Sequence, residues 1–266
     1  MTQHLTRQLG PFGAVMMGLG SIVGTGVFVS IGVAAGIAGP SVVLAVVLGA
    51  FIATLNGLSS AQLAACHPVS GGTYAYGYRF LSPILGFSAG WLFLIAKSAS
   101  AATAALGFAG YVLGLLGAAG QGSGGRGLLV PVALLALLAL TLLVLSGLQR
   151  SSLANTLIVS VTLASLGLFV IFGLPVALER APVTFTDLFG GGLRGLLEAT
   201  ALMFVAYTGY GRIATLGEEV REPLRTIPRA IVLTLLATLV LYGLVSFVAV
   251  GAVGSAVLGD PAHRAA

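Results

Sequence analysis

The chain has 266 residues, of which 58% are hydrophobic and only 7% are charged, and its mean hydropathy is +1.08. A soluble globular domain of this composition could not cover its surface with polar groups, so the composition predicts an integral membrane protein in contact with the lipid bilayer. The net charge of +5 is small and scattered along the chain, which argues against a nucleic-acid partner.

Seven apolar segments are long enough to cross a bilayer, which takes roughly 20 residues in a helix. We therefore expect a single transmembrane domain over residues 1–266, built from about seven helices. The expected segments cover, in order, residues 12–38, 41–65, 84–117, 128–148, 153–178, 193–216 and 227–258.

The distribution of arginines orients the expected bundle. With a cytoplasmic N-terminus, seven arginines fall on the inner side and four on the outer side, in accord with the positive-inside rule. The sequence thus predicts a multi-pass protein of the plasma (inner) membrane whose N-terminus is cytoplasmic. The inner set is Arg7, Arg79, Arg150, Arg212, Arg221, Arg225 and Arg229.

The first apolar segment is interrupted at its centre by the sequence GSIVGTG, residues 20–26. Its glycines, together with Ser21 and Thr25, lower helix propensity at a depth where a plain membrane anchor has leucines. An unpaired backbone N–H or C=O is costly in hydrocarbon, so irregular backbone persists there only where it faces protein or a polar cavity. The break therefore predicts a polar ligand for the freed backbone groups.

The third segment carries Lys97 near its middle, and no other basic residue lies clearly inside an expected span. Ionisable groups at such depth are costly, face the interior of the bundle and mark ion or substrate pathways. The alternative is a lysine whose long side chain extends to the membrane surface. The central position of Lys97 favours the first interpretation.

The sixth segment has a second break, because FVAYTGYGR at 204–212 places Gly209 and Gly211 among tyrosines and Thr208. Two glycine-interrupted segments at corresponding places in two halves of a membrane protein indicate a transporter binding site. The alternative is that these glycines only allow the helices to pack closely. The hydroxyl residues in both clusters favour the binding site.

Three motifs resemble the amino acid–polyamine–organocation permeases: GSIVGTGVF at 20–28, HPVSGGTYAY at 67–76, and FVAYTGYGRIATLGEEVREPLRTIPRAI at 204–231. The resemblance implies an all-α membrane protein, a leucine-transporter-like bundle built from two inverted five-helix repeats. This sequence would hold the first repeat and two helices of the second, so we expect a permease truncated after its seventh transmembrane helix. The implied function is secondary active transport of amino acids; the alternative is a non-transporting structural fragment of a permease.

The resemblance also implies where an amino acid would bind. Its carboxylate would meet the backbone amides of Thr25 and Gly26, where the positive end of a half-helix dipole favours an anion. Its ammonium would meet carbonyl oxygens at the ends of the other half-helices, and an aromatic side chain would cover it. Glycines at the two breaks complete the implied substrate-binding set, which is Ile22, Gly24, Thr25, Gly26, Phe204, Val205, Tyr207 and Gly209.

Coupling to protons, or exchange, is expected from the charges. Some proton-coupled relatives carry a lysine in the fifth helix, but matching NTLIVSVT at 155–162 to that pattern places Thr162 there. Lys97 is therefore the expected ion-coupling residue. No metal, cofactor or enzymatic activity is expected, because the three histidines lack metal-ligand spacing and no nucleophile motif is found. The single cysteine, Cys66, excludes an intrachain disulfide.

Overall fold

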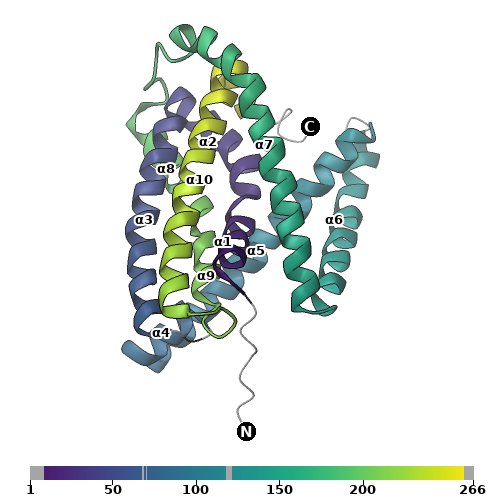
Figure 1. Ribbon diagram of the computed structural model, residues 1–266. Coiled ribbons are helices and arrows are strands. Elements are labelled where there is room, and N and C mark those ends of the chain that lie inside the picture. Colours follow the sequence, from purple (N-terminus) through teal and green to yellow (C-terminus); the bar gives the residue numbers. More distant parts are fainter. Residues whose placement is uncertain (1–8, 68, 70, 118–121, 261–266) are drawn as a thin grey trace.

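The computed structural model describes residues 9–67, 69, 71–117 and 122–260, which form a bundle of helices without β-strands (Figure 1). Arg7 of the expected inner set lies outside the described residues. Five helical stretches of the described chain are long and apolar enough to cross a membrane, which confirms the expected all-α membrane fold. They are Pro11–Cys66, Pro83–Leu115, Gly127–Leu145, Ser151–Thr184 and Pro223–Val253.

The first of these stretches contains the first two expected segments. The chain turns back on itself between them, near Gly39 (Figure 1). Gly39 has a φ of 63°, a left-handed conformation that favours glycine, and Pro40 follows it. The elements before and after this turn are α1 (Pro11–Ile22), the π-helix η1 (Gly26–Ser30), α2 (Ile31–Ala38), the 3-10 turn η2 (Gly39–Ser41) and α3 (Val42–Cys66).

The sixth expected segment is not among the five long stretches, because a 3-10 turn divides it. Helix α8 (Gly192–Tyr207) is followed by the 3-10 turn η3 (Thr208–Tyr210) and by the single turn α9 (Gly211–Ala214). At 16 residues, α8 is shorter than an ordinary spanning helix. The backbone is thus irregular at the glycine cluster that the sequence singles out.

The remaining helices follow the expected segments with shifted ends. The last long helix ends at Val253, not near residue 258, because Gly254 has a φ of 90° and breaks the helix. The helix over the fifth segment is longer than expected and continues through Pro175 and Pro182. These elements are α4 (Thr73–Phe80), α5 (Pro83–Leu115), α6 (Gly122–Leu145), α7 (Leu148–Thr184), α10 (Pro223–Val253) and α11 (Ser255–Gly259).

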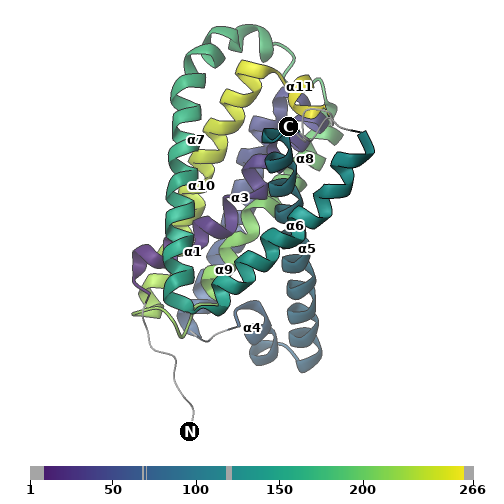
Figure 2. The same cartoon turned by 90° about the vertical axis from the view of Figure 1, so that its right-hand side faces the viewer.

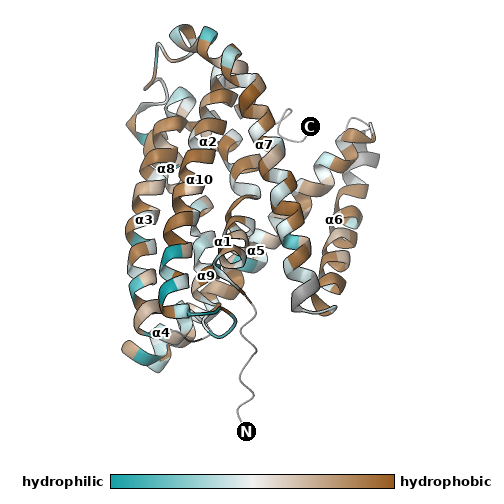
Figure 3. Cartoon of the chain, viewed as in Figure 1, coloured by the Kyte–Doolittle hydropathy of each residue, from teal (hydrophilic) through white to brown (hydrophobic). Residues whose placement is uncertain are grey.

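The packed core lies between α1, α3, α8 and α10, whereas α5 and α6 stand to one side of it (Figures 1 and 2). Alanines on α3, such as Ala45 and Ala53, are fully buried and let the helix backbones approach closely. Hydrophobic residues, brown in Figure 3, cover most of the outer faces of the helices. Exposed side chains such as Trp91 on α5 and Leu135 on α6 contribute to this surface, which is suited to lipid.

Candidate functional site

The first half of the interrupted helix ends at Ile22. The amide of Val23 donates to the carbonyl oxygen of Leu19 at 2.7 Å and closes α1, but Val23 itself has an extended conformation with a ψ of 94°. Because no helical turn continues from this point, the last carbonyl groups of α1 lack intrahelical donors. Ile22, the expected acceptor for a ligand ammonium, lies at this end.

The second half of the interrupted helix begins at Gly24. The carbonyl oxygen of Gly24 accepts hydrogen bonds from the amides of Val27 and Phe28, at 3.2 and 3.1 Å. The amides of Thr25 and Gly26 therefore occupy the first positions of a new helix, where N–H groups have no intrahelical acceptor. Since η1 runs directly into α2, the helix dipole adds positive potential at these two amides.

The two broken helices touch at Gly209. A Cβ atom on Gly209 would overlap the carbonyl oxygen of Ser21 and lie 2.6 Å from Cγ1 of Ile22. Only glycine fits this contact, because any side chain would push the turn η3 away from the end of α1. The structure thus brings together two breaks that are about 185 residues apart in the sequence.

Tyr242 of α10 also reaches the first break, and the sequence reasoning missed it. Its hydroxyl donates a 2.7 Å hydrogen bond to the carbonyl oxygen of Ile22, and a Cβ atom on Gly26 would overlap that hydroxyl. The tyrosine therefore fills the space between the two half-helices. Its only sequence signal is a hydroxyl-bearing aromatic ring in an otherwise apolar run of α10.

Tyr207, expected to cover the ligand, is fully buried and packs against Tyr242 with ring centroids 5.3 Å apart. Its hydroxyl has no hydrogen-bond partner within the described part of the chain. The side chain lies among core residues and does not line the polar cavity described next.

A cavity of about 430 Å³ opens where the two breaks meet α5. Five of the nine site residues expected from the sequence line this cavity. The other four, Gly24, Gly26, Phe204 and Tyr207, do not. Serine and threonine residues from both breaks and from α5 line it as well. Its lining includes Ser21, Ile22, Thr25, Lys97, Ser100, Val205, Thr208 and Gly209.

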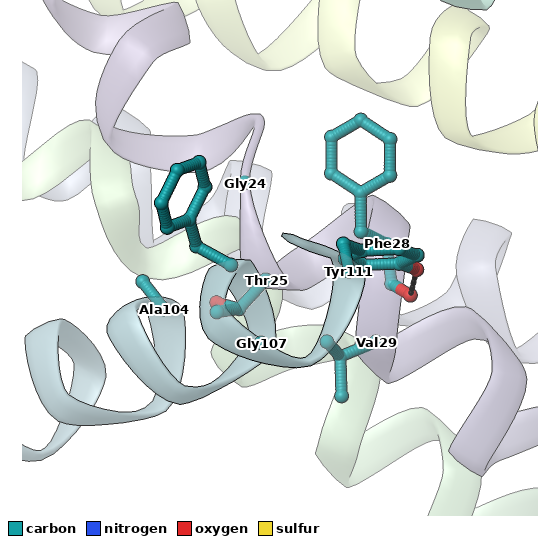
Figure 4. A pocket seen from close by; sticks show the side chains of 8 residues that line it. Gly24, Thr25, Phe28, Val29, Ala104, Gly107 and Tyr111 are labelled. Carbon is teal, nitrogen blue, oxygen red and sulfur yellow. Dashed lines mark hydrogen bonds between the residues drawn. The ribbon is translucent and has the colours of Figure 1, made fainter. Parts of the chain in front are cut away.

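A second cavity, of about 300 Å³, is also lined by Thr25 (Figure 4). Its walls are mainly apolar and come from the first break and from α5, including Ala104 and Gly107. At one end the hydroxyl of Tyr111 donates to the carbonyl oxygen of Phe28 at 3.2 Å. Gly24 and Thr25 both line this cavity, and Thr25 lines the polar cavity as well.

Lys97 stands on the α5 side of the polar cavity. Its ammonium group lies 5.6 Å from the centre of the Phe93 ring, one turn earlier on the same helix. Thr162, which occupies the place of a lysine in some proton-coupled permeases, donates its hydroxyl to the carbonyl of Ile158 on its own helix. Of these two positions, only Lys97 brings a charge to the cavity.

Comparison with known proteins identifies the family of this chain. The model of the amino acid permease family matches residues 13–263. An uncharacterised transporter of Mycobacterium tuberculosis is 40% identical over 94% of this chain and 54% of its own length. The methylthioribose transporter of Bacillus subtilis is 31% identical, with 98% and 59% covered. A branched-chain amino acid permease of the same species is 28% identical, with 94% and 56% covered. The chain thus spans about half the length of the curated relatives it matches.

Proposed function

Because the chain belongs to the amino acid permease family, we propose that it forms a secondary transporter, or the larger part of one, that carries an amino acid across the plasma membrane. Residues 1–266 would form one transmembrane domain with the N-terminus in the cytoplasm. The observation that supports this best is the meeting of two helix breaks at one polar cavity. In secondary transporters, discontinuous helices of this kind hold the substrate near the bilayer midplane.

The carboxylate of the amino acid would bind at the beginning of the second half-helix. The amides of Thr25 and Gly26 are the first of that helix, and they carry the positive end of its dipole. Thr25 lines the polar cavity, and its hydroxyl adds another possible donor. Gly209 also lines the polar cavity and leaves this part of its wall free of a side chain.

The ammonium group would bind carbonyl oxygens at the ends of the other half-helices. The carbonyl of Ile22 already accepts one hydrogen bond from Tyr242, but a carbonyl oxygen has two lone pairs and can accept a second. Val205 lines the cavity and Phe204 does not. The carbonyl oxygen of Val205 already accepts from the amide and the hydroxyl of Thr208, so the ammonium would replace one of these donors there.

Lys97 would couple transport to protons or serve exchange. It is the titratable residue among those that line the polar cavity in the described part of the chain. Ionisable groups inside membrane domains take part in proton relays and substrate pathways, which supports this role. A sodium site is less well supported, because no carboxylate lines the cavity in the described residues.

Radiolabelled amino acid binding tests the proposal directly. The chain would be purified, inserted into lipid nanodiscs and exposed to each class of amino acid, and uptake would be measured in proteoliposomes against empty liposomes. We expect saturable binding that unlabelled ligand displaces and that the Gly26→Val variant loses. A well-folded, inserted chain that binds no amino acid would refute the proposal and favour a non-transporting structural role.

A further inference from the structure

The acidic residues of the chain are distributed unevenly. All seven lie after residue 178, and the first of them is Glu179. The helices α1, α4 and α5, which line most of the polar cavity, therefore contain no carboxylate at all. The first break, η1 and η3, which also line it, contain no carboxylate either. On α8, which contributes Val205, the one acidic residue is Glu198, and it pairs with Arg194 of the same helix at 2.8 Å. The walls of the cavity thus offer Lys97 no negative side chain.

The surroundings of Lys97 do not neutralise its charge by other means. The ammonium group has the face of Phe93 at 5.6 Å and makes no ion pair within the described part of the chain. The cavity around it is lined by hydroxyl groups, including Ser21, Thr25 and Ser100, which are good hydrogen-bond donors to an anion.

A cation that faces a partly enclosed cavity in a membrane protein is costly unless an anion pairs with it. We propose that the ligand brings this anion, so that the substrate is an amino acid with an acidic side chain, whose second carboxylate pairs with Lys97. This inference rests on the proposed function, because the other carboxylate and the ammonium would bind at the helix breaks. A ligand with a cationic side chain would meet the like charge of Lys97, which disfavours it at the same position.

The apolar cavity beyond Thr25 defines the competing outcome. If the ligand side chain entered that space, between Ala104, Gly107 and Phe28, a branched aliphatic amino acid would bind better than an acidic one. Lys97 would then have no part in ligand selection. Leucine, glutamine and glutamate therefore distinguish the two cavities, and glutamine has nearly the shape of glutamate without its charge.

The test measures affinity for these three amino acids in nanodiscs carrying the purified chain. Buffers contain as little chloride as possible and no carboxylate anion, so that a buffer ion does not occupy the site. We expect glutamate to bind on the order of tenfold more tightly than glutamine, as for a hydrogen bond to a charged group. Lys97→Gln should abolish this preference while glutamine still binds, and Lys97→Arg should keep it. Arg194→Gln, which removes an exposed positive charge outside the cavity, should leave the preference intact.

Retained binding of glutamine by Lys97→Gln shows that this variant is folded, so a loss of preference cannot come from misfolding. Equal affinity for glutamate and glutamine in the original chain would overturn the inference and leave the proposed function standing. The same holds if leucine binds most tightly, or if Lys97→Gln keeps the preference for glutamate. Binding of no amino acid by the folded chain would overturn the proposed function and the inference with it.

Discussion

The hydroxyl of Tyr242 on α10 donates a 2.7 Å hydrogen bond to the carbonyl oxygen of Ile22, the last residue of α1. The tyrosine is completely buried, and its ring packs against Tyr207. A carbonyl group at the end of a helix needs a donor, and hydrocarbon offers none. Tyr242 therefore satisfies an acceptor that the helix break exposes, and it attaches the end of α1 to α10.

Replacing Tyr242 with phenylalanine should destabilise the protein. The change removes the phenolic donor and leaves the buried carbonyl of Ile22 one hydrogen bond short, at a cost of about 1–3 kcal/mol in the free energy of unfolding. Denaturant unfolding of the detergent-solubilised chain, followed by fluorescence, would measure this cost. An unchanged unfolding midpoint would show that the bond contributes nothing.

The matched variant Tyr207→Phe should behave differently. The hydroxyl of Tyr207 is buried and has no partner within the described residues, so its removal relieves a desolvated polar group. We expect this variant to be as stable as the original chain or slightly more stable. Because the two tyrosines are in ring contact and undergo the same substitution, a loss of stability in both would indicate general packing damage instead of a specific hydrogen bond.

Gly26→Val should abolish amino acid binding. The first added carbon would overlap the hydroxyl of Tyr242 and lie 3.2 Å from Cβ of Ala206, so the beginning of the second half-helix must move. The amide proposed to bind the carboxylate would move with it. Radiolabelled amino acid binding measures the loss, and unchanged binding would remove Gly26 from the site.

Gly24→Ala is the matched control for this steric argument. A Cβ atom on Gly24 has no other atom within 4 Å, and its backbone does not lie in the left-handed region. We expect its thermal stability to equal that of the original chain. A similar loss of stability in Gly24→Ala and Gly26→Val would mean that glycine is needed at both positions for chain flexibility, not for the contact with Tyr242.

The two helix breaks could be predicted from the sequence because their cause is local. Glycines and small polar residues at 20–26 and 204–209 lower helix propensity wherever the rest of the chain lies. The place of Lys97 near the middle of α5 could be predicted for a similar reason, since the length of the apolar run fixes the middle of the helix. Lys97 lines the same cavity as residues of both breaks, but its role in ion coupling stays a prediction.

The contribution of Tyr242 could not be predicted, because it depends on a contact across 220 residues. Nothing in the neighbouring sequence of α10 distinguishes this tyrosine from a core residue. The direction of Tyr207 was equally hidden, since a motif fixes the position of a residue along a helix but packing sets the rotation of the helix. The end of α10 at Val253 depends on the conformation of one glycine, Gly254.

Gly209→Ala should weaken the contact between the two broken helices. The added methyl group would overlap the carbonyl oxygen of Ser21 and crowd Ile22, both of which are part of a rigid helix end. Overpacking of this kind typically costs about 1–3 kcal/mol. Gly211→Ala changes the same short segment but meets no atom within 4 Å, so it should cost little. Unfolding midpoints of the two variants test this; equal values would contradict the proposed contact.

Lys97→Met should flatten the pH dependence of amino acid binding and uptake. Lys97 is the titratable group among the residues that line the polar cavity in the described chain, and methionine cannot take up a proton. Lys97→Arg should flatten the profile too, because a guanidinium remains charged at every accessible pH. Comparing Lys97→Met with Lys97→Arg separates ion coupling from ligand selection, since only Lys97→Arg keeps the positive charge. A pH profile that survives both substitutions, or strict dependence on sodium, would show that Lys97 has another task.

Leu9→Pro should detach the beginning of the chain from the loop that follows α9. The amide of Leu9 donates to the carbonyl oxygen of Glu219 at 3.1 Å, and the carbonyl of Leu9 accepts from the amide of Arg221 at 2.9 Å. Proline removes the first of these donors, because it has no N–H group. Loss of this hydrogen bond should weaken the neighbouring one from Arg221 to Leu9, so the hydrogen-exchange rate of the Arg221 amide should increase.

Gly10→Pro is the control. The backbone of Gly10, with a φ of −82°, already suits proline, and an added Cβ would have no atom within 4 Å. Equal protection of Arg221 in the two variants would mean that this pairing does not hold the loop.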